Sequence, residues 1–322
     1  MTKMNAAVVT SFDEPPHYQE FEVPTPAAAA QLLVDVLAVG LHPRVRSGAA
    51  GGHYTSTGRL PMIPGIDGVG RRPDGKRIYF VAEDHVLGSM AEKALVDVGR
   101  WIELPDQTDA ATVAATMNPA MSAWVALRRR VPIQPGQSVL VLGATGNAGT
   151  MAIQIAKLLG AGRTVGAGRD AERLKALTAV GADAIIQLTE DADATAGAIA
   201  EAAADVDIVI DYLWGRPTEQ ALPALLTARP DRSRQLDWIQ IGAIAGPTIE
   251  LPSIALRSAN LRIQGNGQGA VSPQAYLAEL PSLIDQIDAG AISLKPNPRA
   301  LADVELAWRS VDGPGERTVL LP

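Results

Sequence analysis

The sequence predicts an α/β protein with two parts, a β-rich unit and a unit built on a doubly wound parallel sheet. In residues 1–120, short apolar runs such as QLLVDVLAVG are separated by proline and glycine, a pattern typical of strands in an irregular sheet. From about Met121 to Gly267, apolar runs alternate with helical patterns. This alternation with short connections predicts parallel strands that are covered by helices on both faces.

The individual elements follow the same patterns. In the first part, strands are expected at NAAVVTSF, QLLVDVLAVG, KRIYFVA and KALVDV, and the proline-rich EPPHYQEFEVPTP is expected as an edge strand or extended segment. In the second part, strands are expected at SVLVLG, TVGAG, AIIQL, DIVIDYL, DWIQIG and LRIQG. The tail predicts one helix over PQAYLAELPSLIDQIDAG, then ALADVELAWRSV and a final strand RTVLLP.

The composition excludes several function classes. The 322 residues include no cysteine, so disulfide frameworks, thiolate zinc sites and cysteine nucleophiles are excluded. The net charge of −7 and dispersed basic residues oppose binding to nucleic acid. The segment MTKMNAAVVTSF lacks the apolar core of a signal peptide, and no apolar stretch is long enough to span a bilayer. We therefore expect a soluble, cytoplasmic protein with no membrane partner.

A glycine-rich turn lies between the first strand and the first helix of the parallel sheet. Gly143, Gly146 and Gly149 are spaced by three residues. In this context the early glycines permit a tight turn and close backbone approach, and the last permits helix–strand packing. The N-terminus of the following helix then offers free N–H groups to a phosphate. The alternative is a tight turn without a ligand. The predicted cofactor-binding residues of the turn are Gly143, Ala144, Thr145, Gly146, Asn147, Ala148 and Gly149.

The end of the next strand predicts which dinucleotide binds. NAD-preferring sites usually carry Asp or Glu there, whereas this chain has Gly168 followed by Arg169, with Arg173 one helical turn further. Guanidinium groups bind a 2′-phosphate that a carboxylate would repel. The sequence therefore favours NADPH over NADH. The alternative is a solvated helix start in which Asp170 serves as N-cap.

Several short motifs follow one another along the chain: RSG at Arg46–Gly48, PGIDGVG at Pro64–Gly70, GSMAEKALVD, PGQSVLVLGATGNAGTMAIQIAKLLGA and DVELAWRSV…ERTVLLP. In their order and spacing, the chain resembles, over nearly its full length, a medium-chain dehydrogenase/reductase of the zinc-independent quinone oxidoreductase type. The resemblance implies a GroES-like catalytic domain over residues 1–120, completed by residues 271–322. It also implies a Rossmann NADP-binding domain over residues 121–270.

The resemblance also assigns the remaining cofactor contacts. It implies a nicotinamide near Asn118 and Ser122, and an adenosine half near Tyr212. It places the ends of the fifth and sixth strands beside the nicotinamide, with the residues Gly242, Ala243, Ile244, Asn266 and Gly267.

The implied reaction is hydride transfer from NADPH to a small-molecule acceptor, a quinone or an α,β-unsaturated carbonyl. Tyr54 lies in a loop that closes over the substrate in relatives, and its hydroxyl is the first candidate for hydrogen bonding to the acceptor oxygen. The alternative is a packing aromatic in a loop. His42 is the second catalytic candidate, against a hydrogen-bonded histidine of structural role. Relatives often carry Asn-x-x-Asp where this chain has His42 to Val45, so the substrate pocket is expected to differ.

Three other functions compete with this one. A catalytically silent NADPH-binding sensor or structural protein would bind the cofactor without turnover. A zinc alcohol dehydrogenase needs three protein ligands, and His42 with Asp67 supplies only two, so no metal is predicted. A nucleic-acid-binding module would show strongly salt-dependent binding. Since relatives commonly pair an edge strand across a two-fold axis, we also predict a homodimer through ANLRIQGNG.

Overall fold

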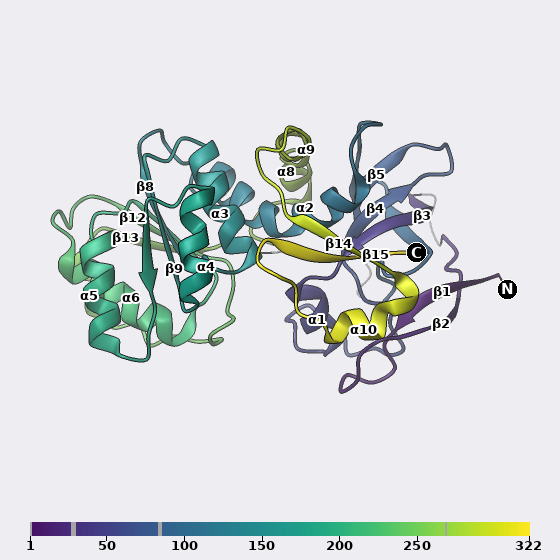
Figure 1. Cartoon of the computed structure of the whole chain (residues 1–322), viewed down its shortest axis with the longest axis horizontal. Helices are drawn as coiled ribbons and strands as arrows, with labels where there is room; N and C mark the ends of the chain where they lie inside the picture. The colour runs from purple at the N-terminus through teal and green to yellow at the C-terminus, as the bar shows by residue number, and fades with distance from the viewer. Residues whose placement is uncertain (1, 27–29, 83–85, 268) are drawn as a thin grey trace. The chain divides into compact units, whose positions relative to one another are not determined.

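The fold is taken from a computed structural model that describes residues 2–26, 30–82, 86–267 and 269–322. Contacts within the chain divide it into two compact units. The first unit contains residues 1–118 together with 273–322, and the second contains residues 119–272. The two units are described separately below (Figure 1).

The first unit is built on an antiparallel-rich sheet. Its strands are ordered β14-β15-β3-β4-β5-β7, and β6 also pairs with β3, while β1 and β2 form a separate two-stranded sheet. The bounds are β1 Lys3–Val8, β2 His17–Glu22, β3 Gln31–Gly40, β4 Asp67–Arg71, β5 Arg77–Val81, β6 Lys93–Asp97, β7 Trp101–Glu103, β14 Lys295–Ala300 and β15 Glu316–Leu321. All the strands expected before residue 100 are present, and the proline-flanked segment forms β2.

Strands β4, β7 and β14 of this unit were not predicted from the sequence. Strand β14 has the sequence KPNPRA and pairs with β15 in parallel. Two prolines remove ladder donors and argue against a central strand. The position of β14 at the end of the sheet explains how they are tolerated, because an edge strand leaves one row of backbone groups unpaired.

The helices of the first unit correct a second prediction. The segment expected as one helix forms two, because Pro281 has no N–H and its ring clashes with the carbonyl four residues earlier. The bounds are α1 Pro43–Ala49, α8 Pro273–Leu277, α9 Leu280–Asp288, the short 3₁₀ turn Leu301–Asp303 and α10 Val304–Arg309. Helix α2, Ala110–Val125, begins in the first unit and ends in the second, where it continues into a π-helical turn at Ala126–Arg130.

The second unit contains the predicted parallel sheet of six strands, in the order β10-β9-β8-β11-β12-β13. The bounds are β8 Ser138–Leu142, α3 Asn147–Leu158, β9 Arg163–Gly168, α4 Ala171–Ala176, a 3₁₀ turn at Leu177–Val180, β10 Ala184–Gln187, α5 Ala192–Ala203, β11 Ile208–Asp211, α6 Gly215–Ala228, β12 Leu236–Gln240, α7 Ser253–Ser258 and β13 Leu261–Gly265. The expected α/β fold class is confirmed.

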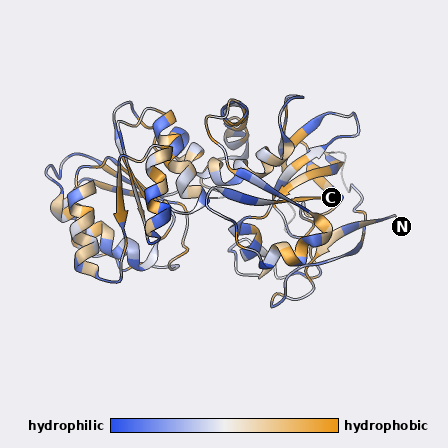
Figure 2. Cartoon of the chain, in the orientation of Figure 1, coloured by the Kyte–Doolittle hydropathy of each residue, from blue (hydrophilic) through white to orange (hydrophobic). Residues whose placement is uncertain are grey.

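The sheet of the second unit is buried on both faces. Strands β8 and β11 are fully buried, which explains their continuous apolar sequences. Figure 1 shows α3 and α4 on one side of the sheet and α5 and α6 on the other. In Figure 2, the strand arrow seen in the middle of this unit is coloured orange, which marks hydrophobic residues.

The order of the strands creates a site at one edge of this sheet. From β8 the chain moves outward to β9 and β10, then returns to β11 on the other side of β8. The carboxyl ends of parallel strands lie at one edge, and the crevice at such a reversal is where open α/β sheets bind ligands. The six strands end at this edge with Leu142, Gly168, Gln187, Asp211, Gln240 and Gly265.

Candidate functional site

The glycine turn joins β8 to α3, and each glycine has a separate structural reason. Gly143 has φ +85°, a conformation that favours glycine. A Cβ on Gly149 would lie 2.2 Å from the carbonyl oxygen of Gly143, so α3 packs directly on the turn. A Cβ on the exposed Gly146 would meet only that same oxygen, at 3.6 Å. The inner side of the turn is therefore closely packed, and its outer side is accessible to a ligand.

The turn also leaves the N-terminus of α3 without a side-chain cap. Gly146 is the N-cap residue and makes no side-chain hydrogen bond, and the helix has twelve residues. Helix N-termini combine unsatisfied N–H groups with positive dipole density. A pyrophosphate fits this end. Around it lie the other turn residues predicted from the sequence, the buried Ala144 and the half-buried Thr145, Asn147 and Ala148.

The end of β9 lies against this turn. A Cβ on Gly168 would lie 2.7 Å from the Cγ2 atom of Thr145. Arg169 is exposed, and its guanidinium pairs with no carboxylate of the described residues. Arg173 forms a loose ion pair with Asp170, with Nε and Oδ2 3.6 Å apart. Asp170 also caps α4 by accepting two backbone N–H groups, as the alternative interpretation expected. The free positive charge beside the turn therefore comes mainly from Arg169.

A polar cluster occupies the other half of the same edge. The hydroxyl oxygens of Ser122 and Tyr212 are 2.8 Å apart, and Asn266 donates its Nδ2 hydrogen to the Ser122 carbonyl at 2.9 Å. The three residues come from α2, from the loop after β11 and from the end of β13. The structure thus brings together three residues predicted to contact a cofactor. It places Tyr212 with Ser122, the residue expected at the nicotinamide.

A buried carboxylate holds the loop after β11. Asp211 is fully buried. Its Oδ1 atom accepts the N–H groups of Leu213 and Trp214 at 2.8 and 2.9 Å. Its Oδ2 atom accepts the Thr218 hydroxyl at 2.6 Å and the Trp238 indole N–H at 3.0 Å. Four donors and the N-terminus of α6 therefore stabilise the carboxylate without a basic side chain.

The same loop contains a strained residue. Trp214 has φ +54° and ψ −164°, close to a region that is populated almost only by glycine. Gly215 follows with φ +57°, and a Cβ there would lie 2.8 Å from the Ala245 carbonyl oxygen. The loop thus packs on the segment after β12. Strain of this kind costs about 1–3 kcal/mol and persists only where the surroundings hold it.

The remaining predicted cofactor residues lie at the same edge or on α2. Gly242 is half-buried and accepts the Gln240 amide, and a Cβ on it would lie 2.7 Å from the Tyr212 carbonyl oxygen. Ala243, Ile244 and Gly267 are exposed. Asn118 lies on α2, four residues before Ser122, and is half-buried.

The two catalytic candidates occupy contrasting environments in the first unit. His42 is 2% exposed, and its Nε2 atom lies 3.1 Å from Oδ1 of Asp67. Tyr79 donates its hydroxyl to the other oxygen of that carboxylate at 2.7 Å. Burial lowers the pKa of His42 and raises that of Tyr79, so both groups are neutral near pH 7. Nε2 therefore donates to Asp67, and His42 belongs to a buried polar network.

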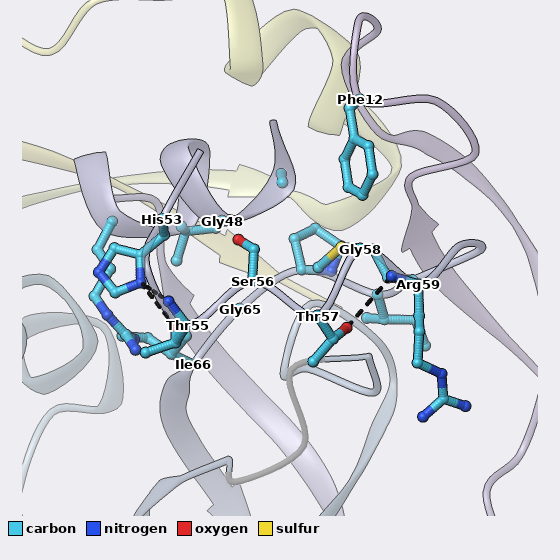
Figure 3. A pocket seen from close by; sticks show the side chains of 16 residues that line it. Phe12, Gly48, His53, Thr55, Ser56, Thr57, Gly58, Arg59, Gly65 and Ile66 are labelled. Carbon is cyan, nitrogen blue, oxygen red and sulfur yellow. Dashed lines mark hydrogen bonds between the residues drawn. The ribbon is translucent and has the colours of Figure 1, made fainter. Parts of the chain in front are cut away.

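Tyr54, by contrast, is 73% exposed. Its ring contacts that of His53, with centroids 4.3 Å apart. The neighbouring segment lines a pocket of the first unit together with α1 and Phe12 (Figure 3). His53 Nδ1 accepts hydrogen bonds from Thr55, and the Arg59 N–H donates to the Thr57 hydroxyl, and these bonds shape the pocket wall. The structure does not bring Tyr54 and His42 together: one side chain is exposed, and the other is enclosed.

The residues that the structure describes do not offer a zinc site. The chain has no cysteine, and no three His, Asp or Glu side chains of the described residues come close enough to share a metal. His85, one of the four histidines, lies outside the described residues. The absence of a metal stays a prediction.

Comparisons with known proteins support the family resemblance. A family profile described as "Zinc-binding dehydrogenase" matches residues 148–228, which begin in the glycine turn. The "Probable NADPH-dependent quinone reductase tdiC" of Emericella nidulans is 28% identical over 364 aligned positions, covering 99% of this chain and 100% of that protein. "Quinone oxidoreductase" of Homo sapiens is 33% identical over 140 residues, 40% of this chain and 42% of the human protein.

The solved structures agree in fold. The quinone oxidoreductase from Thermus thermophilus, which was also solved in complex with NADPH, matches with a TM-score of 0.79 and 25% identity over 99% of this chain and 100% of the other. The comparisons support a quinone oxidoreductase-like medium-chain dehydrogenase/reductase. This confirms the resemblance inferred from the sequence landmarks. The region matched by the family profile begins at Ala148, so only the last two residues of the turn at Gly143–Gly149 lie within it.

Proposed function

We propose that this medium-chain dehydrogenase/reductase is an NADPH-dependent oxidoreductase that reduces a quinone or an α,β-unsaturated carbonyl without zinc. The observation that carries the proposal is the accessible glycine turn at the N-terminus of α3, with Arg169 beside it. Among the residues that the structure describes, no carboxylate forms an ion pair with the Arg169 guanidinium. The turn suits a pyrophosphate, and the guanidinium suits a 2′-phosphate. The names of the full-length relative and of the Thermus thermophilus protein support the same cofactor and acceptor class.

The residues of the chain then have distinct tasks. NADPH, when bound, supplies a hydride. The N-terminus of α3 and Arg169 bind its phosphates, and the ends of β11, β12 and β13 orient its other half. In the first unit, the exposed Tyr54 hydroxyl offers a donor to the oxygen on which negative charge develops. His42 contributes through its network with Asp67 and Tyr79, which fixes the start of α1 beside the pocket.

The test follows NADPH and NADH consumption separately against a panel of quinones and enones. We expect turnover with NADPH, and an Arg169→Asp variant should lose most of the preference for NADPH over NADH. Lys175→Asp is the matched control. It replaces a positive side chain on α4 with a negative one, as Arg169→Asp does, but Lys175 is exposed and pairs with Glu172. NADPH binding without turnover on any acceptor would favour a catalytically silent sensor, and an unchanged preference in Arg169→Asp would contradict the role of Arg169.

A homodimer through β13 belongs to the same proposal. β13 is an edge strand of the parallel sheet, and the adjacent helix α7 exposes Ile254 and Leu256 by 64% and 51%. Unpaired strand edges and exposed apolar side chains favour association.

Among the described residues, the structure contains no helix with the length and apolarity of a membrane span. A cytoplasmic location stays a prediction.

A further inference from the structure

The strand order determines which end of a bound dinucleotide lies over which strands. The glycine turn follows β8, and Arg169 follows β9, on one side of β8. Strands β11, β12 and β13 lie on the other side. If the pyrophosphate binds at the turn and the 2′-phosphate binds Arg169, the nicotinamide half extends over the ends of β11 to β13. Tyr212 directly follows β11, so it belongs to the nicotinamide half rather than to the adenosine half suggested by the resemblance.

The hydrogen bonds of Tyr212 indicate what it does there. Ser122 donates its hydroxyl hydrogen to the Pro119 carbonyl at 3.0 Å, so Tyr212 is the donor in the 2.8 Å bond between the two hydroxyls. Burial raises the pKa of Tyr212 and keeps it a donor at neutral pH. Asn266 binds the Ser122 carbonyl from the other side. Residues outside α2 therefore hold both parts of Ser122: Tyr212 binds its hydroxyl, and Asn266 binds its backbone carbonyl.

The loop that carries Tyr212 is itself held rigidly. The Asp211 carboxylate binds the N–H groups of the next two residues after Tyr212, and Trp214 keeps a strained backbone conformation. The carbonyl of Tyr212 also packs against Gly242. A hydroxyl on such a loop is positioned in advance of ligand binding, and such preorganisation increases affinity without new contacts.

We propose that Tyr212 is a positioning residue for the nicotinamide half of the cofactor and acts through the hydroxyl of Ser122. With one hydrogen donated to Pro119 and one accepted from Tyr212, the Ser122 oxygen keeps a lone pair for an amide N–H, the donor of a nicotinamide carboxamide. The inference rests on the proposed NADPH-dependent function.

The experiment measures dissociation constants for two ligands by titration calorimetry. NADPH spans both halves of the site, whereas 2′,5′-ADP contains only the adenosine half with its phosphates. Tyr212→Phe should weaken NADPH binding about 5- to 10-fold, the effect of one hydrogen bond, and leave 2′,5′-ADP binding unchanged within about 2-fold. Ser122→Ala should do the same, and the double variant should be no weaker than Ser122→Ala alone. Tyr18→Phe, on β2 of the first unit, is the matched control.

The outcomes separate the inference from the function on which it rests. Equal weakening of both ligands by Tyr212→Phe would place Tyr212 in the adenosine half and overturn the inference. Unchanged NADPH binding, or additive losses in the double variant, would overturn the action through Ser122. Wild-type protein that binds 2′,5′-ADP and NADPH but reduces no acceptor would leave the inference standing and remove the proposed reductase activity. Wild-type protein that binds neither ligand would overturn both.

Discussion

Replacing Asp211 with asparagine tests the carboxylate that organises the loop after β11. The substitution keeps the shape of the side chain but removes its charge and turns one oxygen into an NH₂ group. All four hydrogen-bond partners of Asp211 are donors. The new NH₂ group must therefore face at least one donor. The least costly orientation keeps the carbonyl oxygen on the Leu213 and Trp214 N–H groups and turns the NH₂ towards Thr218 and Trp238.

The magnitude follows from those partners. The Thr218 hydroxyl can rotate and accept from the amide, so its cost is small. The indole N–H of the fully buried Trp238 has no such freedom and loses its acceptor, which costs about 1–3 kcal/mol. Losing a negative charge at the N-terminus of α6 costs about 0.3–1 kcal/mol more, and up to about 2 kcal/mol in a buried setting. We expect the free energy of unfolding of the second unit to fall by roughly 2–4 kcal/mol.

The assay is urea unfolding followed by tryptophan fluorescence and by circular dichroism, in parallel for the wild type, Asp211→Asn, Trp238→Phe and the double variant. Because Trp238→Phe removes the conflicting donor, the loss in the double variant should be smaller than the sum of the single losses by about 1 kcal/mol or more. A loss below about 0.5 kcal/mol for Asp211→Asn, or strict additivity, would refute the assignment of Asp211 as the centre of this network.

Three further predictions concern other parts of the chain. Gly149→Ala should destabilise the second unit by about 1–3 kcal/mol and abolish NADPH binding, because its Cβ would lie 2.2 Å from the Gly143 carbonyl oxygen. The control Gly197→Ala, on α5 with nothing within 4 Å, should keep or gain stability in the same melts and titrations. Burial lowers the pKa of folded His42 below its ordinary value of 6.5, so the unfolded chain binds the extra proton first and stability is lost as pH falls below about 6.5. Wild type should therefore lose stability between pH 6.5 and 5 more steeply than His42→Asn, by up to about 1.4 kcal/mol per pH unit; equal slopes in urea titrations would contradict this. Ile254→Glu should convert the proposed dimer to a folded monomer in light scattering, whereas Val98→Glu, equally exposed in the first unit, should not; a wild type that is already monomeric at micromolar concentration would remove the dimer from the proposal.

The elements that could be predicted are those whose signal is local. The buried strands of the parallel sheet are continuous apolar runs, and Gly143, Gly146 and Gly149 mark the turn, because both depend on residues adjacent in sequence. Strand β14 was missed because its two prolines oppose a strand, and only its place at the edge of the sheet tolerates them. The predicted single helix in the tail is divided at Pro281, which lies at the start of α9 and cannot continue a preceding helix.

The functional side chains were harder to predict because their contacts join distant segments. Ser122, Tyr212 and Asn266 meet across 144 residues of sequence, and no periodicity indicates their hydrogen bonds. The resemblance assigned Tyr212 to the adenosine half by its position after a strand, whereas the strand order, which the sequence does not state, supports our proposal of the nicotinamide half. Asp211 gave one usable signal, a carboxylate at a strand end directly before a helix, but its partner Trp238 lies on the next strand.

Two buried carboxylates, one in each unit, show how this chain fixes polar side chains near its candidate sites. Asp67 is 3% exposed and accepts from His42 and Tyr79, and Asp211 is fully buried and accepts from four neutral donors. A buried ion pair would recover little of its desolvation cost, whereas neutral donors satisfy the carboxylate and are themselves oriented by it. The effect of removing either carboxylate should therefore be local first. Its loss should mobilise the groups that it orients, the imidazole of His42 in one unit and the Tyr212 loop in the other, under conditions in which the neighbouring sheet remains folded.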